Sequence, residues 1–188
     1  MTITAREIAD IIIDAESSRK GIDQISEAHP DIPVETAYEA QKLFVQNKLD
    51  AGDSFVGWKL GLTSRNKQRA MGLAAPLYGR VTSSMLNTHG DPVQLDRFIH
   101  PRVESEIAFL IGRDIEAPAT ITSVLAATEA VMGAVDVLDS RYESFKFTLS
   151  DVVADNASAG AFYLGPRRAQ AGGPDRPQPA RLRGAGRR

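Results

Sequence analysis

The sequence predicts a mixed α+β protein, in which a small helical N-terminal part precedes a β-rich core. Apolar residues recur at helical spacing up to about residue 49, and the composition becomes that of strands from residue 54. Residues 103–111 alternate between two faces, as a strand does. We therefore divide the 188 residues into a helical part (1–52), a core (53–166) and a tail (167–188).

The helical part contains two expected helices. Thr4 and Glu7 form a capping box before a run of isoleucines at helical spacing, and Gly21 is expected to end this first helix. A second helix is expected over residues 34–49, and the proline-containing residues 29–33 predict a rigid connection between the two.

The core is expected to hold four strands, at residues 54–62, 103–111, 134–138 and 161–164. A helix is expected over residues 122–132, ended by Gly133. Residues 64–90 are polar and interrupted by glycine and proline, so loops with one short helical turn are expected there.

The tail differs from the rest of the chain in charge and composition. Residues 167–188 contain seven Arg and one Asp, a charge of +6, so residues 1–166 carry −8 of the net charge of −2. With Leu182 as its only large apolar side chain, the tail is expected to be disordered. The acidic body argues against nucleic-acid binding.

Composition excludes several classes of protein. The chain has no cysteine, which excludes a disulfide scaffold, a cysteine zinc site and thiol catalysis. No apolar run reaches the length of a membrane span, and the charged N-terminus is not that of a signal peptide. We therefore expect a cytoplasmic protein with no membrane partner.

Two carboxylates stand out in the alternating strand. Glu104 and Glu106 project from one face, about 7 Å apart at Cα, and two like charges there repel unless a cation lies between them. One reading is a solvated strand face. The other is a metal site, with Asp136 as the third ligand, although a salt bridge could explain the acids near it. Three oxygen ligands without Cys or nearby His suit Mg²⁺ or Mn²⁺ better than Zn²⁺.

Other polar residues are less specific. Lys59 lies in an apolar, glycine-flanked stretch, where it could be an edge lysine reaching water or a cation that holds a substrate carboxylate or moves a proton. Residues 155–158 form a polar turn that would by itself be structural, and His100 is expected to be a capping or core histidine.

Five ordered motifs resemble a known family. They begin at Gly57, Pro76, His100, Asp139 and Val153, and read GWKLGLTS, PLYG, HPRVESEIAF, DSRYESFKF and VADNAS. The chain resembles the 2-keto-4-pentenoate hydratase / 4-oxalocrotonate decarboxylase family, related to fumarylacetoacetate hydrolases, over about residues 4–165. The PLYG and SRYE-x-FKF versions are more similar to the decarboxylase branch.

The resemblance implies a fold and a site. The fold would be a helical N-terminal part and a strongly bent, β-barrel-like core whose mouth holds Mg²⁺ or Mn²⁺. The family's metal ligands fall on Glu104, Glu106 and Asp136, of which the last is Glu in the family. The implied catalytic residues are Lys59 and Ser158, and the implied substrate-binding residues are Tyr78, Arg141 and Asn156.

The implied activity is metal-dependent decarboxylation of the 2-oxo acid 4-oxalocrotonate (2-oxohex-3-enedioate) to 2-hydroxypenta-2,4-dienoate, in the meta-cleavage catabolism of aromatic compounds. The alternatives are hydration of the dienol by a 2-keto-4-pentenoate hydratase, and a catalytically silent relative that acts only as an oligomer subunit.

The resemblance ends near Gly165, where family members continue with further strands. The Arg/Pro/Gly/Ala tail stands in their place and resembles the translation of a shifted reading frame. We therefore expect an incomplete core with an unpaired strand edge, and a homo-oligomer or a complex with the related hydratase or decarboxylase.

Overall fold

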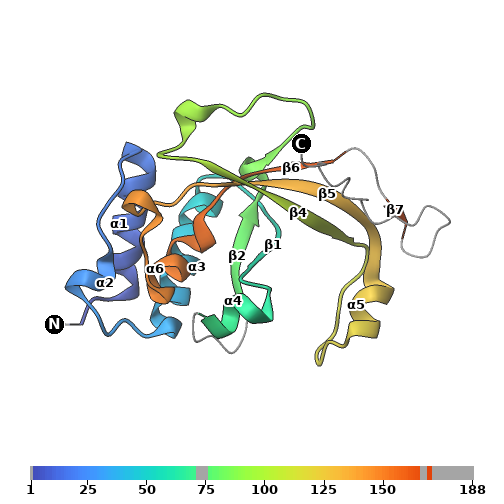
Figure 1. Cartoon of the computed structure of the whole chain (residues 1–188), viewed down its shortest axis with the longest axis horizontal. Coiled ribbons are helices and arrows are strands. Elements are labelled where there is room, and N and C mark those ends of the chain that lie inside the picture. The colour runs from blue at the N-terminus through green and yellow to red at the C-terminus, as the bar shows by residue number, and fades with distance from the viewer. Residues whose placement is uncertain (1, 71–75, 166–168, 171–188) are drawn as a thin grey trace, which may run out of the picture.

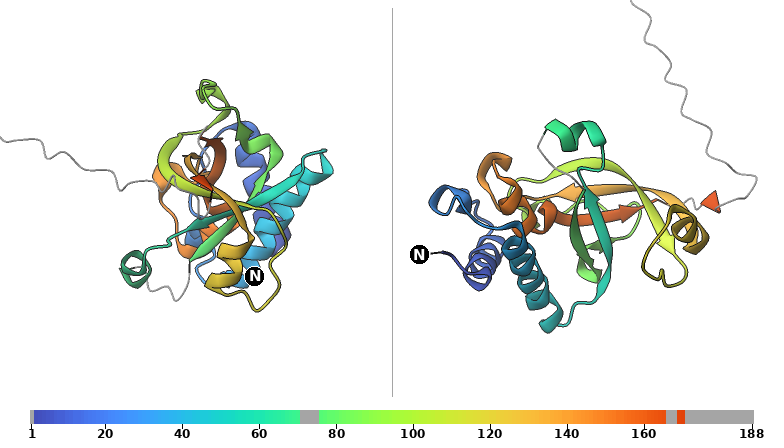
Figure 2. Two further views of the ribbon diagram at one scale, coloured as in Figure 1. Left: turned by 90° about the vertical axis from the view of Figure 1, so that its right-hand side faces the viewer. Right: turned by 90° about the horizontal axis from the view of Figure 1, so that it is seen from below.

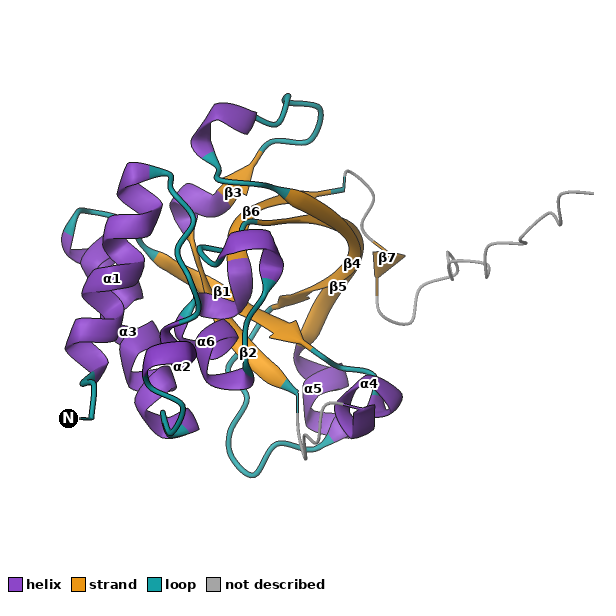
Figure 3. Ribbon diagram, turned by 60° about the vertical axis from the view of Figure 1, so that its left-hand side comes forward, coloured by secondary structure: helices purple, strands orange, loops and turns teal. Residues whose placement is uncertain are grey.

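The computed structural model describes residues 2–70, 76–165 and 169–170, and it shows an α+β protein (Figure 1). Helices α1 (Ala5–Ser18), α2 (Ile25–Ala28), α3 (Val34–Asp50) and α6 (Leu149–Ala154) gather at one side of the molecule, and the strands lie on the other (Figure 3). The α+β prediction is confirmed.

The helical side is built as its sequence predicts, with two differences. The Thr4–Glu7 capping box opens α1, and the helix ends at Arg19, whose φ of 54° is left-handed, two residues before Gly21. The single turn of α2 and the helix α6 were not predicted, although α6 has its own capping box at Thr148 and Asp151. Isoleucines of α1 and aromatic and aliphatic side chains of α3 and α6 form the main core.

The smaller sheet pairs β1 (Phe55–Gly61) with β2 (Leu77–Thr82) in antiparallel fashion. The prediction of loops over residues 64–90 is correct for the short helix α4 (Arg65–Ala70) and wrong for β2, the 3₁₀ turn η1 (Ser83–Met85) and β3 (Leu86–Asn87). Glycine and proline suggested loops, but Leu77 and Val81 alternate into the core, and this burial determines the strand.

The larger sheet has the order β3-β6-β5-β4, with β7 beside β5. Its strands β4 (Arg102–Ile111), β5 (Thr128–Leu138) and β6 (Ala159–Leu164) are antiparallel, and β3 pairs parallel to β6. β4 and β5 bend together along their length (Figure 2). The strands of the described residues form two separate sheets and no closed barrel, which corrects the barrel expectation for this part of the chain.

One segment that was expected to be helical is partly a strand. The helix expected over residues 122–132 is only α5 (Ile121–Ala127), and the chain enters β5 at Thr128. Residues 128–132 pair with β4, where Ala130 lies opposite Leu110 and Val131 opposite Phe109. Backbone pairing with a ten-residue neighbour outweighs the helix propensity of this segment, and Ala130 and Met132, two residues apart, are both buried, as on one face of a strand.

Two residues of the predicted tail lie in the described part of the chain. Ala169–Gln170 forms the short strand β7, which pairs with Ala130 and Val131 of β5. At these two residues the structure differs from the expected disorder, because β5 extends beyond β6 and offers a free edge there. The prediction for residues 167–168 and 171–188 falls outside the described residues. No helix among those described is long and apolar enough to span a bilayer.

Candidate functional site

A pocket of about 250 Å³ lies between the two sheets and the turn that precedes β6. Four of the predicted site residues line it: Lys59 from β1, Glu104 and Glu106 from β4, and Ser158 from the 3₁₀ turn η4 (Asn156–Ser158). The rest of its lining is mostly apolar: Leu60, Gly61, Leu62, Thr63, Ser64, Leu77, Leu138, Phe145, Phe147, Val152 and Ala157. Such a pocket suits a small molecule with an apolar chain and a charged or polar end.

A buried ion pair lies at the pocket. The ammonium of Lys59 is 2.7 Å from Oδ2 of Asp136, and both side chains are almost fully buried. Burial lowers the pKa of Lys59, although Asp136 opposes that change. Burial likewise raises the pKa of Asp136 against the effect of Lys59. Of the two readings of Lys59, the exposed edge lysine is therefore wrong, because its charge lies inside the protein.

The three predicted metal ligands share one face of the larger sheet. Glu104 lies directly opposite Asp136 in the β4–β5 register, and Glu106 follows two residues along β4. Oδ1 of Asp136 is buried and has no hydrogen-bond partner among the described residues, and a bound cation would satisfy it. Both glutamates are exposed, and in the described part of the chain no three His, Cys, Asp or Glu side chains are gathered closely enough to hold an ion. The donor types and their shared face fit a divalent cation, and the ligand set stays a prediction.

Backbone strain concentrates around the pocket. Four of its lining residues, Leu62, Phe145, Ala157 and Ser158, have φ between 54° and 56°, a region that non-glycine residues rarely adopt. Each costs on the order of 1–3 kcal/mol and persists only where the surrounding structure imposes it. The hydroxyl of Ser158 donates to Asp155, 3.2 Å away, which orients this side chain at the pocket wall.

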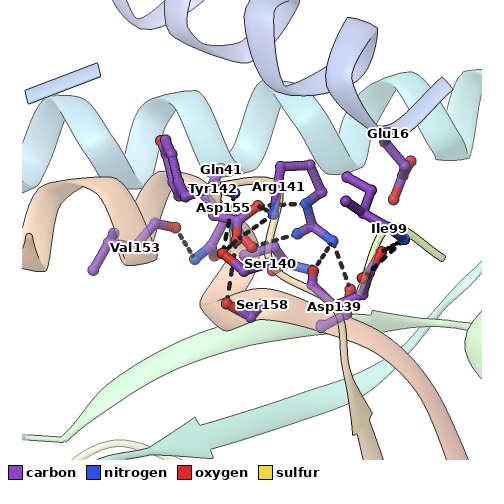
Figure 4. Close-up of polar contacts among 12 residues, drawn as sticks. Glu16, Gln41, Ile99, Asp139, Ser140, Arg141, Tyr142, Val153, Asp155 and Ser158 are labelled. Carbon is purple, nitrogen blue, oxygen red and sulfur yellow. Dashed lines mark hydrogen bonds and ion pairs between the residues drawn. The ribbon is translucent and has the colours of Figure 1, made fainter. Parts of the chain in front are cut away.

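Asp155 and Arg141 form a fully buried network behind the pocket (Figure 4). Nε of Arg141 pairs with the Asp155 carboxylate, Nη1 donates to the carbonyls of Asp139 and Ala159 at 2.7 and 3.2 Å, and Nη2 donates to the Asp155 carbonyl at 2.6 Å. Burial raises the pKa of Asp155 to about 6, against the lowering effect of Arg141. Arg141 does not line the pocket, so the geometry favours a structural role over the predicted substrate contact.

Tyr78 and Asn156 also lie outside the pocket lining. Tyr78 stacks on Tyr38 with ring centroids 4.3 Å apart. The Asn156 amide accepts a hydrogen bond from the backbone N–H of Arg80 and donates one to its carbonyl, at 2.7 and 2.8 Å. Asn156 therefore attaches the η4 turn to β2, and Tyr78 attaches β2 to α3. The structure offers no support for their predicted substrate contacts.

The sequence analysis missed the apolar wall and the residue that orients Ser158. Phe145, Phe147 and Val152 carry no signal that distinguishes a pocket wall from a core, because both require apolar side chains. Asp155 was noted only as part of a polar turn. Its role comes from contacts with residues about 15 positions earlier in the chain, which a local pattern does not contain.

No family model matches the chain, but comparison with known proteins finds similar decarboxylases and hydratases. A 4-oxalocrotonate decarboxylase of a Pseudomonas species is 40% identical over 158 residues, which cover 84% of this chain and 61% of the relative. A 2-hydroxypent-2,4-dienoate hydratase of Pseudomonas putida is 37% identical over 161 residues, which cover 85% of this chain and 72% of the relative.

A solved structure agrees with these relatives. The 4-oxalocrotonate decarboxylase of Pseudomonas putida G7, complexed with magnesium and adipate, superposes with a TM-score of 0.82 at 32% identity, over 90% of this chain and 66% of that one. The chain thus spans about 60% of the length of the curated decarboxylases that it matches.

Proposed function

The chain belongs to the family of 4-oxalocrotonate decarboxylases and 2-keto-4-pentenoate hydratases, and on this premise we propose that it is a metal-dependent carbon–carbon lyase of meta-cleavage aromatic catabolism. Its substrate is 4-oxalocrotonate (2-oxohex-3-enedioate), which loses CO₂ to give 2-hydroxypenta-2,4-dienoate. The observation that carries the proposal is the buried Lys59–Asp136 pair at a mostly apolar pocket beside Glu104 and Glu106.

We propose that Glu104, Glu106 and Asp136 hold Mg²⁺ or Mn²⁺. Their shared face, the partnerless Oδ1 of Asp136 and the magnesium in the solved relative support this assignment. When bound, the ion supplies Lewis-acid polarisation of the substrate's 2-oxo group. Asp136 is one methylene shorter than the Glu of the family, so we expect it to be the weakest of the three ligands.

The reaction needs an electron sink and a dry site. As the C5–C6 bond breaks, its electron pair forms the C4–C5 double bond, the C3–C4 double bond shifts to C2–C3, and negative charge develops on the C2 oxygen. The ammonium of Lys59 would donate a hydrogen bond to that oxygen and stabilise the charge. Phe145, Phe147 and Val152 would exclude water from the carbon chain. The hydroxyl of Ser158, which donates to Asp155, would donate instead to the C1 carboxylate of the bound substrate.

The test of this function is turnover with and without Mg²⁺. Lys59→Met keeps the apolar stem and removes the charge, so the rate of CO₂ release should fall at least ~100-fold. The exposed Lys20→Met is the matched control and should retain full activity. Unchanged turnover in Lys59→Met would contradict the assignment of the site.

Metal binding is tested separately, by calorimetry with Mg²⁺ or Mn²⁺ alone. Glu106→Gln should weaken binding, and Asp136→Glu should strengthen it because the longer side chain reaches further toward the other two ligands. Equal binding by the wild type and Glu106→Gln would overturn the proposed ligand set.

A second candidate function is hydration of 2-hydroxypenta-2,4-dienoate. The similarity to a hydratase of which the chain covers 72% favours it. Both reactions share the 2-oxo acid end of the substrate, so the distal end distinguishes them. Water addition to 2-hydroxypenta-2,4-dienoate, without CO₂ release from 4-oxalocrotonate, would establish the hydratase. Metal binding with neither reaction would establish a silent relative.

We further propose that the protein self-associates through β4. Among the described strands, β4 pairs with β5 alone, which leaves its other edge free, and Val103, Ile107 and Phe109 are 67, 65 and 54% exposed on one face. An antiparallel pair with Ile107 opposite its copy places Val103 opposite Ile111 and no like charges opposite each other. A two-residue shift that sets Glu106 against Glu106 is disfavoured by repulsion.

A further inference from the structure

One arginine near the pocket has no role in the proposed mechanism. Arg102 is the first residue of β4 and lies on the same face as Glu104 and Glu106. It pairs in register with Leu138, which lines the pocket. Its guanidinium carbon lies 3.9 Å from the ring centroid of Phe145, another lining residue. Arg102 therefore lies at the rim of the pocket.

The charge of Arg102 is held in place without being neutralised. Stacking on Phe145 orients the planar guanidinium and leaves its N–H groups available at the edge. No carboxylate of the described residues pairs with Arg102 within 4.0 Å, and its side chain is exposed. An oriented, unpaired guanidinium can bind a carboxylate through two parallel hydrogen bonds.

The position of Arg102 matches the length of a six-carbon diacid. Among the described lining residues Lys59 is the one cation, and its partner Asp136 lies opposite Glu104. Arg102 is two residues from Glu104 along the strand, about 7 Å at Cα. The two carboxyl carbons of an extended six-carbon diacid are about 6 Å apart, since five C–C bonds separate them. This step along β4 is close to the length of such a diacid, so one molecule would reach from the Lys59–Asp136 pair toward Arg102.

We propose that Arg102 is a specificity-determining residue that binds the distal carboxylate of a dicarboxylic 2-oxo acid and so selects diacids over monoacids of the same length. The inference rests on the proposed function, because it assumes that the 2-oxo acid end lies at Lys59. The adipate in the solved relative is a six-carbon diacid of the kind that this pair of cations would accept. A pocket that selects diacids favours decarboxylation, since the distal carboxylate is the group that leaves as CO₂.

The experiment compares adipate with hexanoate as probes of the whole 188-residue chain, by calorimetry in the presence of Mg²⁺. The wild type should bind adipate more tightly, and Arg102→Gln should lose at least ~10-fold in adipate affinity while hexanoate affinity stays the same. Arg113→Gln removes the same charge from an exposed position after β4 and should bind like the wild type. Arg102→Lys keeps the charge without the planar fork and should lie between the two.

Steady-state kinetics distinguish substrate binding by Arg102 from a purely structural role. Contact with the departing carboxylate is made in the ground state, so Arg102→Gln should raise KM and leave kcat unchanged or higher. Arg102→Gln that binds adipate as tightly as the wild type, or a wild type that does not prefer adipate, overturns the inference even where decarboxylation is observed. Preference for adipate that depends on Arg102, in a protein that releases no CO₂, upholds the inference and overturns the decarboxylase function.

Discussion

The isoleucines of α1 and the apolar residues of β4 have similar side chains in opposite surroundings. Ile8 and Ile12 are 1% and 0% exposed against α3 and α6, whereas Val103 and Ile107 are 67% and 65% exposed on the outer face of the sheet. In both elements the periodicity correctly identifies an apolar face. It does not tell whether anything within the chain covers that face, which depends on the rest of the fold.

Substitutions in the two regions should therefore have different effects, on stability at the helical side and on association at β4. The helical side buries its apolar surface and holds the Arg141–Asp155 network, so substitutions there should change the free energy of unfolding. The outer face of β4 contributes little to folding, and substitutions there should change contacts between molecules. The pocket lies between the two regions and depends on the helical side for its rigidity.

The largest effect is expected from breaking the buried network. Arg141→Met removes the guanidinium and leaves the Asp155 carboxylate buried without a counter-charge, which should cost about 3–5 kcal/mol of unfolding free energy. Chemical denaturation followed by circular dichroism measures the loss. The exposed Arg6, paired with Asp10 on α1, is the matched control, and Arg6→Met should change stability by less than about 1 kcal/mol. Equal losses in the two variants would show that the network does not stabilise the fold.

A pair of isoleucines tests the comparison directly. Ile12→Ala opens a cavity in the helical core and should cost about 2–5 kcal/mol. Ile107→Ala removes the same atoms from the exposed face of β4 and should change the unfolding free energy by less than about 0.5 kcal/mol, measured at a protein concentration where the chain is monomeric. Similar losses at the two sites would mean that β4 is covered within the chain.

The sequence predicted elements with a strong local signal and failed where distant contacts decide. The Thr4 cap, α3 and the alternating residues of β4 were read correctly, because local spacing determines them. The start of β5 at Thr128 was missed, since the short run that ends at Met132 does not distinguish a helix from a strand locally, and its pairing with β4 decides.

The candidate site follows the same rule. Lys59, Glu104, Glu106 and Ser158 were brought to one pocket as the family motifs implied. The motifs also contain Tyr78, Arg141 and Asn156, whose contacts join neighbouring elements outside the pocket lining. A motif therefore shows that a residue belongs to the site region, and only its contacts show whether it faces the pocket.

A smaller effect is expected at Asp53, between α3 and the β1–β2 sheet. Its carboxylate accepts hydrogen bonds from the hydroxyls of Ser83 and Ser84, and from the backbone N–H of Ser84 at 3.0 Å. Burial alone would raise the pKa of Asp53, but these bonds, with Thr82, hold it well below its usual value. Asp53→Asn should cost about 1 kcal/mol at pH 7, because the carboxylate is only partly buried and is screened by solvent.

The contribution of Asp53 to stability should depend on pH. A depressed pKa contributes stability that is fully present above the unfolded value of about 3.9 and is lost progressively as the pH falls from there through the lower folded value. The wild type should therefore lose more stability than Asp53→Asn between pH 5 and pH 2, and the two denaturation midpoints should converge in acid. Parallel midpoints over that range would show that Asp53 makes no such contribution.

The smallest effect on stability, and a clear effect on association, is expected from a charge on β4. Ile107→Lys places an ammonium opposite its own copy in the proposed pairing, so like-charge repulsion and the loss of apolar contact both oppose association. Because Ile107 is 65% exposed, the unfolding free energy of the single chain should change by no more than about 0.5 kcal/mol. Ile121→Lys introduces the same charge at an 81% exposed position on α5, outside the proposed interface. In sedimentation experiments, Ile107→Lys should shift the protein toward the monomer at concentrations where the wild type and Ile121→Lys remain associated. A wild type that stays monomeric at every concentration, or an Ile107→Lys variant that associates as the wild type does, would show that β4 is not the surface through which the chains meet.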